Sequence, residues 1–249
     1  MIAIIGGSGL TQLANLRISH RQIVRTPYGE PSGPLTFGSI GDTQVVFLAR
    51  HGYGHTLAPH EINYRANLWA LHARGATHVV SICTVGGIAP ELGAGTIAIP
   101  DQIIDYTWGR TSTYFEGAQT PVTHIDFTYP YNEELRQAAL AAAREAGVPV
   151  VANGTYAATQ GPRLETKAEI DRLDRDGATM VGMTGMPEAA LARELGLPYA
   201  HVAVVVNPAA GRGSSARSVS VEDIGRVIEE SMGNVRLIVA RLVERHGNP

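Results

Sequence analysis

The chain has 249 residues, 44% of them hydrophobic, which is enough for one large buried core. A formal net charge of −3 at pH 7 argues against a protein that binds nucleic acid or a membrane surface. The only cysteine, Cys83, excludes an internal disulfide and a cysteine-based metal cluster, and it fits a reducing compartment. We therefore expect a cytoplasmic protein without nucleic-acid or membrane partners.

A short apolar run, Ile2 to Ile5, is typical of a buried strand and leads into Gly6-Gly7-Ser8-Gly9. It lacks the basic flank of a signal peptide, and no apolar run approaches the ~18 residues of a membrane span. The glycine loop either presents backbone N–H groups and the Ser8 hydroxyl to an anion or is a plain turn. A dinucleotide fingerprint is disfavoured because Gln12 stands where a third glycine is needed.

Two strands joined by a hairpin turn are expected at residues 35–40 and 44–49, and the second ends at Arg50-His51. The guanidinium fork and the imidazole of this pair would form a clamp for an oxyanion. His51, His55 and His60 fit a metal site poorly, because the glycines and proline between them prevent a shared helix face. We expect no metal.

The rest of the chain alternates between strand and helix patterns. Further strands are expected at residues 77–85, 96–100, 153–159 and 199–206. Helices are expected at residues 61–74, 132–147, 167–173 and 221–245. This alternation predicts a single α/β domain, residues 1–249, with a central, mostly parallel or mixed β-sheet flanked by helices. The irregular aromatic stretch 105–129 is either a functional loop or an interface.

The functional hypothesis begins with residues 180–188. A short apolar run ends at Met183-Thr184-Gly185, and Pro187-Glu188 then open a helix-forming run, where the glutamate suits the helix dipole. Thr184 would lie beside a helix N-terminus whose N–H groups favour an anion, with the soft Met183 side chain next to the group attacked. An ordinary strand–helix turn is the alternative.

Small or polar residues follow several expected strands, and ligands of parallel α/β sheets bind outside the carboxyl ends of strands. These residues are Ser8, Arg50-His51, Cys83-Thr84, Glu165, Met183-Thr184 and Asn207. Together they describe an anion pocket, an apolar floor and two groups able to recognise a heterocycle. Glu165 could instead cap a helix, and Asn207 could bond the loop backbone. Because no serine forms a nucleophile elbow, the attacking group is expected to be the bound anion.

Six motifs resemble those of the trimeric purine nucleoside phosphorylase and methylthioadenosine phosphorylase superfamily. They are residues 4–9 (IIGGSG), 50–52 (RHG), 63–67 (NYRAN), 85–87 (VGG), 161–166 (GPRLET) and 183–188 (MTGMPE). The resemblance covers nearly the whole chain and is closest to the bacterial branch that cleaves S-methyl-5′-thioinosine. It implies a homotrimer with inorganic phosphate as co-substrate and no cofactor.

The resemblance also implies roles for individual residues. The implied phosphate-binding residues are Ser8, Arg50, His51, Thr84 and Thr184. The implied nucleoside-binding residues are Met183, Asn207, Pro208, Ala209, Glu165, Val221 and, from a neighbouring subunit, His124. The implied catalytic residues are Asn207, Thr184 and His51.

Three positions are expected to set specificity. Adenine-specific relatives carry serine and aspartate where Glu165 and Asn207 stand, and a carboxylate at 165 needs the N1–H donor of a 6-oxopurine. Val221 falls where ordinary purine nucleoside phosphorylases keep a histidine for the 5′-hydroxyl, so an apolar residue there, with Val219 nearby, suits a 5′-methylthio group. The expected reaction is phosphorolysis of S-methyl-5′-thioinosine to hypoxanthine and 5-methylthioribose 1-phosphate.

Other activities remain open. An inosine/guanosine phosphorylase would share the base-binding residues, whereas Glu165 and Asn207 disfavour a methylthioadenosine phosphorylase. A nucleotide-binding protein without turnover or a hydrolytic nucleosidase would leave the Arg50-His51 clamp without a role. Two departures from the family pattern are Cys83-Thr84 and the segment 212–217.

Overall fold

A computed structural model describes residues 1–10 and 13–247, and its centre is a mixed sheet of eleven strands. The strands are β1 (Ile2–Gly6), β2 (Arg17–Gln22), β3 (Leu35–Ile40), β4 (Thr43–Ala49), β5 (His78–Gly87), β6 (Ile97–Ala98), β7 (Gln102–Asp105), β8 (Val150–Val151), β9 (Thr155–Ala158), β10 (Met180–Gly182) and β11 (Tyr199–Pro208). The helices are α1 (Tyr64–Ala73), α2 (Glu133–Glu145), α3 (Lys167–Arg175), α4 (Gly185–Glu194) and α5 (Val221–Gly247), with a short 3₁₀ helix, η1 (Gly213–Ser215).

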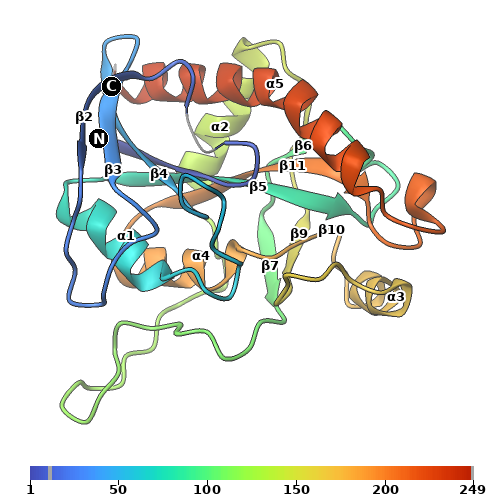
Figure 1. The fold of residues 1–249 in the computed structure, drawn as a ribbon, viewed down its shortest axis with the longest axis horizontal. Coiled ribbons are helices and arrows are strands. Elements are labelled where there is room, and N and C mark those ends of the chain that lie inside the picture. Colours follow the sequence, from blue (N-terminus) through green and yellow to red (C-terminus); the bar gives the residue numbers. More distant parts are fainter. Residues whose placement is uncertain (11–12, 248–249) are drawn as a thin grey trace.

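Strand β5 holds the sheet together. It pairs in parallel with β1 and β11, and its last residues, Gly86 and Gly87, pair antiparallel with β10. The main path through the sheet runs β2-β3-β4-β1-β5-β10-β9-β7, while β11 leads from β5 to β6 and β8. Helices α2 and α5 cover one face and α1 and α4 the other (Figure 1). The predicted single α/β domain is therefore confirmed.

Strand β1 shows why the sheet is covered on both faces. All five of its residues are buried, and alternate side chains enter opposite layers. Ile2 and Ile4 pack in the cluster that contains the α5 residues, whereas Ala3 and Ile5 pack in the cluster that contains those of α1. An apolar strand without alternation of polar residues is thus explained by burial from two sides.

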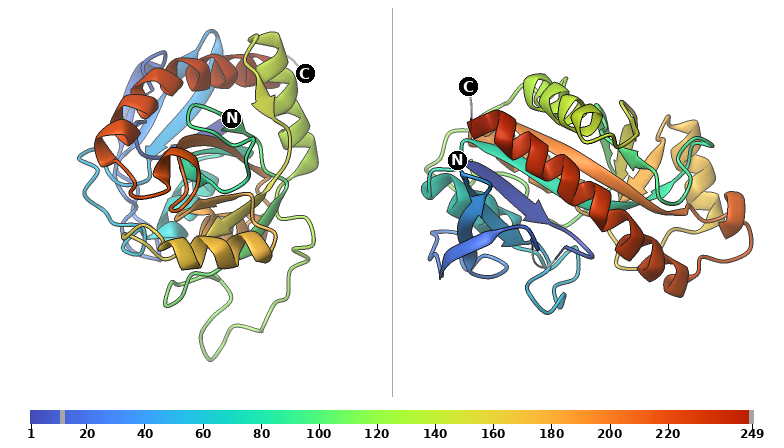
Figure 2. Two further views of the ribbon diagram at one scale, coloured as in Figure 1. Left: turned by 90° about the vertical axis from the view of Figure 1, so that its right-hand side faces the viewer. Right: turned by 90° about the horizontal axis from the view of Figure 1, so that it is seen from above.

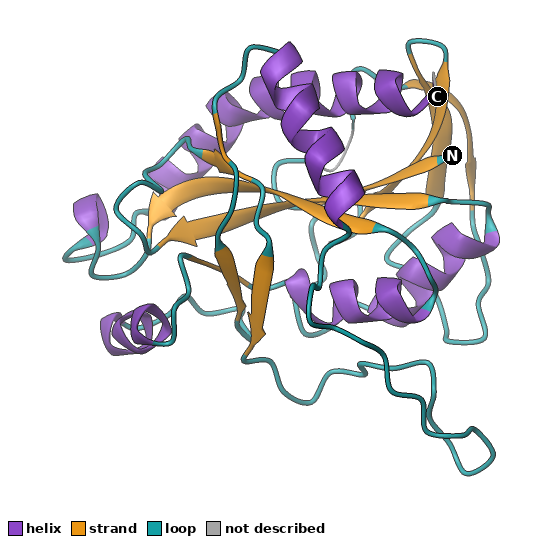
Figure 3. Ribbon diagram, turned by 180° about the vertical axis from the view of Figure 1, so that it is seen from behind, coloured by secondary structure: helices purple, strands orange, loops and turns teal. Residues whose placement is uncertain are grey.

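The two edge strands of the main path were not predicted. Strand β2, at one edge, is almost entirely exposed and polar, so it lacks the apolar alternation that marks a half-buried strand. Strand β7, at the other edge, begins beyond the predicted strand 96–100. The irregular segment after β7 projects from the body of the molecule (Figures 2 and 3). Within the described residues, no helix is long and apolar enough to cross a membrane.

A buried ion pair joins β4 to α4. Arg50 follows β4 directly, and its Nε and Nη2 donate to Oε2 and Oε1 of Glu188 at 2.7 and 2.9 Å. Both side chains are 0% exposed. Glu188 was expected to serve the helix dipole. Glu188 does lie in the first turn of α4, but its carboxylate is buried and binds Arg50, a role that the sequence pattern did not predict.

Burial disfavours the charged forms of both Arg50 and Glu188, but their mutual interaction outweighs this effect. Burial alone would lower the pKa of Arg50 and raise that of Glu188. The mutual attraction and the shared hydrogen bonds reverse both effects, so the pKa of Arg50 is raised and that of Glu188 is lowered. Both groups are therefore charged in the folded protein.

A chain of hydrogen bonds ends on the Glu188 carboxylate. The Tyr199 hydroxyl donates to Oε1 at 2.7 Å, so it must accept the Nε2–H of His201, 2.6 Å away. The Nδ1 atom of His201 then accepts from the Tyr131 hydroxyl at 3.0 Å. Burial lowers the pKa of His201 to about 3, which keeps the ring neutral as this direction of donation requires. Ser81 adds a further donor to Oε1 at 2.7 Å.

We predict that Glu188→Gln lowers the free energy of unfolding by about 3–5 kcal/mol, because it leaves the Arg50 guanidinium buried without its counter-charge. The matched control is Glu230→Gln, which removes an exposed partner of Arg226 and should cost less than about 1 kcal/mol. Urea unfolding at one protein concentration compares the two. If both variants lost the same unfolding free energy, burial would not be what makes the Arg50–Glu188 pair strong.

Candidate active site

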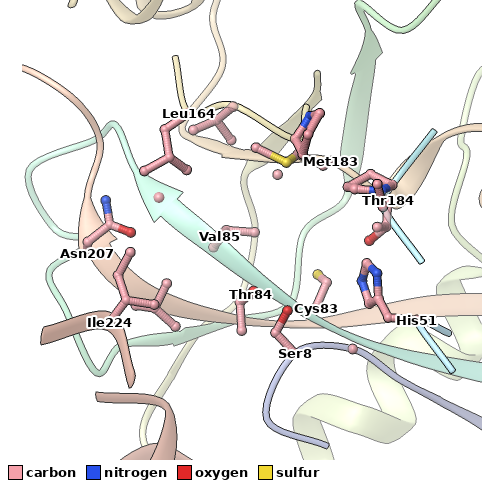
Figure 4. Close-up of a pocket in the computed structure, with 18 of the residues that line it drawn as sticks. Ser8, His51, Cys83, Thr84, Val85, Leu164, Met183, Thr184, Asn207 and Ile224 are labelled. Carbon is pink, nitrogen blue, oxygen red and sulfur yellow. The ribbon is translucent and has the colours of Figure 1, made fainter. Parts of the chain in front are cut away.

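A cavity of about 440 Å³ opens at the ends of β1, β4, β5, β10 and β11. Predicted site residues that line it are Ser8, Arg50, His51, Thr84, Glu165, Met183, Thr184, Asn207 and Ala209. Figure 4 shows Ser8, His51 and Thr184 at one end and Asn207 at the other. The cavity is therefore polar at one end, where hydroxyl and imidazole groups meet, and carries an amide at the opposite end.

The guanidinium of Arg50 lies buried behind the polar end. Besides the two bonds to Glu188, Nη2 donates to Ser81 Oγ at 2.5 Å and Nη1 to the Ile82 carbonyl at 3.0 Å. Four of the five N–H groups are thus used, and the side chain is fully buried, so protein groups surround the guanidinium. A Cβ on Gly7 would lie 2.9 Å from Nη1, so glycine is needed for this close approach. The expected fork toward an oxyanion is wrong, because that fork binds Glu188.

His51 contributes a neutral imidazole to the polar end. Its Nδ1 is 2.8 Å from the Leu57 carbonyl and must donate to it, which leaves Nε2 available to a ligand. Burial and then the charge of Arg50 lower the pKa of His51 to about 4. Near neutral pH, Nε2 is therefore an acceptor, suited to the O–H of a protonated oxyanion.

The N-terminus of α4 does not present its N–H groups as expected. The amides of Thr184 and Gly185 donate to the hydroxyl of the buried Tyr156 at 3.2 and 3.3 Å. A Cβ on Gly182 would lie 2.2 Å from this hydroxyl, so glycine makes room for it. The Thr184 side chain makes no capping bond and lines the cavity. Thr184 can therefore meet an anion through its hydroxyl instead of through its backbone.

Asn207 is aimed into the cavity by an irregularity of β11. The pairing of β11 with β5 shifts register between Val205 and Asn207, and such a bulge redirects side chains. One amide hydrogen of Asn207 is used, since Nδ2 donates to the Pro208 carbonyl at 2.6 Å. The second hydrogen and Oδ1 remain for a ligand, which is the donor–acceptor pair that a purine edge needs.

Glu165 does not cap α3, because other residues form the cap. The Thr166 side chain and Glu169 form a reciprocal capping box at the start of this helix. Glu165 instead accepts a hydrogen bond from the Thr159 hydroxyl at 2.6 Å through Oε1 and lines the cavity. Thr159 thereby fixes one carboxylate oxygen and leaves Oε2 to accept from a ligand.

Met183 and Cys83 complete the cavity wall between the two ends. A Cβ on Gly161 would lie 2.4 Å from the Met183 sulfur, so the loop after β9 closes tightly over this side chain. Burial raises the pKa of Cys83 to about 12, which makes it a neutral, unreactive thiol. Thr84, the other unusual residue of this pair, is half-buried and lines the cavity.

The cavity leaves out three predicted residues. Val221 begins α5 with its side chain 75% exposed, and Val219 and Ile224 line the cavity instead. Its expected placement is wrong for this structure, because the first turn of α5 turns it toward solvent. Pro208 contributes only the carbonyl that holds Asn207. His124 is exposed on the projecting loop and does not line its own chain's cavity.

Sequence reasoning missed four residues that organise the site: Thr159, Tyr156, Ser81 and Arg110. Ser81, Tyr156 and Arg110 act through partners distant in sequence, whereas Thr159 acts on Glu165 six residues later but lies outside the recognised motifs. In the part of the chain that the structure describes, no three His, Cys, Asp or Glu side chains group as a metal site.

The chain is similar to proteins of known family along its whole length. A model of the phosphorylase superfamily matches residues 1–244. A probable S-methyl-5′-thioinosine phosphorylase of Pseudomonas syringae is 51% identical, with 97% of each chain covered. A 6-oxopurine nucleoside phosphorylase of Pyrococcus furiosus is 45% identical, covering 97% of this chain and 91% of the relative.

Solved structures agree. Methylthioadenosine phosphorylase from Schistosoma mansoni, in complex with adenine, superposes with a TM-score of 0.96 at 33% identity, covering 100% of this chain and 92% of that one. The family resemblance inferred from the six motifs is therefore confirmed. The chain belongs to the phosphorylase superfamily and is an enzyme of the nucleoside phosphorylase type.

Proposed function

We propose that this enzyme cleaves S-methyl-5′-thioinosine with inorganic phosphate, releasing hypoxanthine and 5-methylthioribose 1-phosphate. The observation that carries the proposal is a free carboxylate oxygen on Glu165 in a cavity whose opposite ends hold Asn207 and an anion-binding group of side chains. The similar bacterial proteins are named for this activity. No cofactor is needed, because phosphate itself is the nucleophile.

Phosphate would bind at the polar end. The hydroxyls of Ser8 and Thr184 can donate to its oxygens, while Nε2 of His51 accepts from a protonated oxygen. Thr84 supplies a further hydroxyl beside this end. Because Glu188 neutralises Arg50, the site would bind phosphate mainly by directed hydrogen bonds.

The reaction separates charge across the cavity. The C1′–N9 bond breaks with its electron pair passing to the purine, and a phosphate oxygen forms the new bond to C1′. Phosphate held below the sugar stabilises the positive charge on the sugar and then captures it, with the entropy of encounter already lost on binding. Asn207 donates to the purine as negative charge develops, and Glu165 accepts the N1–H. The proton that hydrogen phosphate loses on forming the sugar ester passes to the released base, which leaves as neutral hypoxanthine.

We further propose a cytoplasmic homotrimer. The projecting loop that carries His124 would extend to a neighbouring subunit and complete that subunit's sugar-binding pocket. The proposal follows the family resemblance and the exposure of aromatic and apolar side chains on this loop, Trp108, Val122 and Tyr129. The single unpaired thiol fits the reducing cytoplasm.

A substrate panel tests the reaction itself. We expect hypoxanthine release from S-methyl-5′-thioinosine to require phosphate, and kcat/KM to exceed that for inosine by tenfold or more, since burying the methylthio group contributes roughly 1–3 kcal/mol. Methylthioadenosine should be a poor substrate. Faster turnover of inosine would favour a general 6-oxopurine nucleoside phosphorylase, and release without phosphate would indicate a hydrolase.

Base recognition is tested by the double variant Glu165→Ser with Asn207→Asp. We expect it to gain activity on methylthioadenosine and to lose most activity on methylthioinosine. In the unaltered enzyme the free oxygen of Glu165 needs a hydrogen-bond donor, which only a 6-oxopurine supplies. Mismatched polar contacts of this kind can cost on the order of 10⁴-fold in kcat/KM. The single variants serve as controls, and an unchanged rejection of adenine would refute the assignment of these residues.

The apolar wall is tested by Ile224→His, which would place a hydrogen-bonding group against the cavity. We expect kcat/KM to shift toward inosine by about tenfold, since a histidine can bond the 5′-hydroxyl and disfavours the methylthio group. Val221→His is the matched control, because Val221 faces solvent three residues earlier on the same helix. An equal shift from Val221→His would show that the first turn of α5 closes over bound substrate.

A further inference from the structure

Arg110 lies in the irregular segment after β7 and donates to backbone groups of two separate loops. Its Nη1 donates to the carbonyls of Met183 and Met186 at 2.7 and 2.6 Å. Its Nη2 donates to the carbonyls of Gln160 and Thr159 at 2.8 and 3.3 Å, and Nε to the Gln160 side-chain oxygen at 3.2 Å. One partly buried side chain thus bonds both loops.

These two loops line different parts of the cavity: one lies next to the proposed sugar and anion positions, and the other carries the residue proposed to bind the base. Met183 is the last residue before Thr184, so its carbonyl lies where the sugar floor meets the anion end. The other loop starts at Thr159, whose hydroxyl fixes the Glu165 carboxylate at 2.6 Å. Arg110 therefore connects the floor under the sugar with the residue that reads the base, without lining the cavity itself.

The chemistry of these contacts suits arginine alone. The acceptors are neutral oxygens, and a charged donor bonds them more strongly than a neutral one. The flat guanidinium spans two loops at once and stacks over the Tyr64 ring with 5.6 Å between Cζ and the ring centroid. Lysine presents a single point of charge and cannot reproduce the spread of donors.

We infer that Arg110 is a positioning residue for nucleoside binding. It sets the distance between Met183 and Glu165 and so aligns the sugar with the base-reading carboxylate. The inference rests on the proposed phosphorolysis. It predicts a much larger effect on the nucleoside than on phosphate, because only Thr184 among the phosphate-binding residues adjoins a loop that Arg110 contacts, whereas Ser8 and His51 lie on other loops.

The test measures steady-state kinetics of the full-length enzyme with S-methyl-5′-thioinosine and phosphate varied separately. We expect Arg110→Lys to raise the KM for the nucleoside about tenfold, equivalent to roughly 1.4 kcal/mol, and to leave the KM for phosphate within about twofold. Guanidinium ion added at millimolar concentration should partly restore the nucleoside KM of Arg110→Ala, because it can occupy the vacated site between the two loops.

Arg136→Lys is the matched control. Arg136 donates to the carbonyls of Ile99 and Ala152, so it also joins two separate backbone segments, but neither of these residues lines the cavity. We expect both KM values of this variant to stay within about twofold of the unaltered enzyme. An equal rise in nucleoside KM would reduce Arg110 to a general tether and overturn the inference.

A second variant, Thr159→Val, keeps the test decisive if Arg110 variants fold poorly. It removes the hydroxyl that fixes Glu165 and should raise the nucleoside KM severalfold without changing the KM for phosphate. Combined with Arg110→Lys, its effect should be less than additive, because both act on the same carboxylate. An unchanged nucleoside KM in either variant refutes the inference, whereas absence of phosphate-dependent cleavage by the unaltered enzyme refutes the proposed function instead.

Discussion

The buried pair of Arg50 and Glu188 is the constraint on which the rest of the site depends. An uncompensated charge in this position would be prohibitively unfavourable, so strand β4 and helix α4 must be placed where the two groups meet. Ser81 and Tyr199, on β5 and β11, saturate the same carboxylate. Four elements are thereby locked in register, and the cavity opens at their ends.

The pair also decides how an anion can be held. Since Arg50 is buried and its fork binds Glu188, the groups that face an anion are neutral hydroxyls and a neutral imidazole. A site of this type selects by geometry more than by net charge. That suits a reaction in which phosphate must bind, react at one carbon and leave as part of a sugar ester.

The two residues to which we assign base recognition, Asn207 and Glu165, are held by neighbours that leave half of each polar group unused. Asn207 keeps one donor and its oxygen after bonding Pro208, and Glu165 keeps one oxygen after accepting from Thr159. These preorganised halves form a donor–acceptor pattern before any ligand binds. The similar methylthioadenosine phosphorylase of Schistosoma mansoni shares the fold, so the fold by itself does not identify the base.

The sequence alone was sufficient for the α/β fold, most internal strands and helices, and the loops that line the cavity, because apolar periodicity and glycine-bearing strand ends are local signals. It could not reveal that Glu188 binds Arg50, that Tyr156 occupies the amides at Thr184, or that Arg110 joins two loops. Each of these contacts joins residues separated by at least 28 positions along the chain, so its geometry exists only after the sheet has assembled. The tertiary structure therefore decided which of the polar residues at the strand ends face a ligand and which hold the others in place.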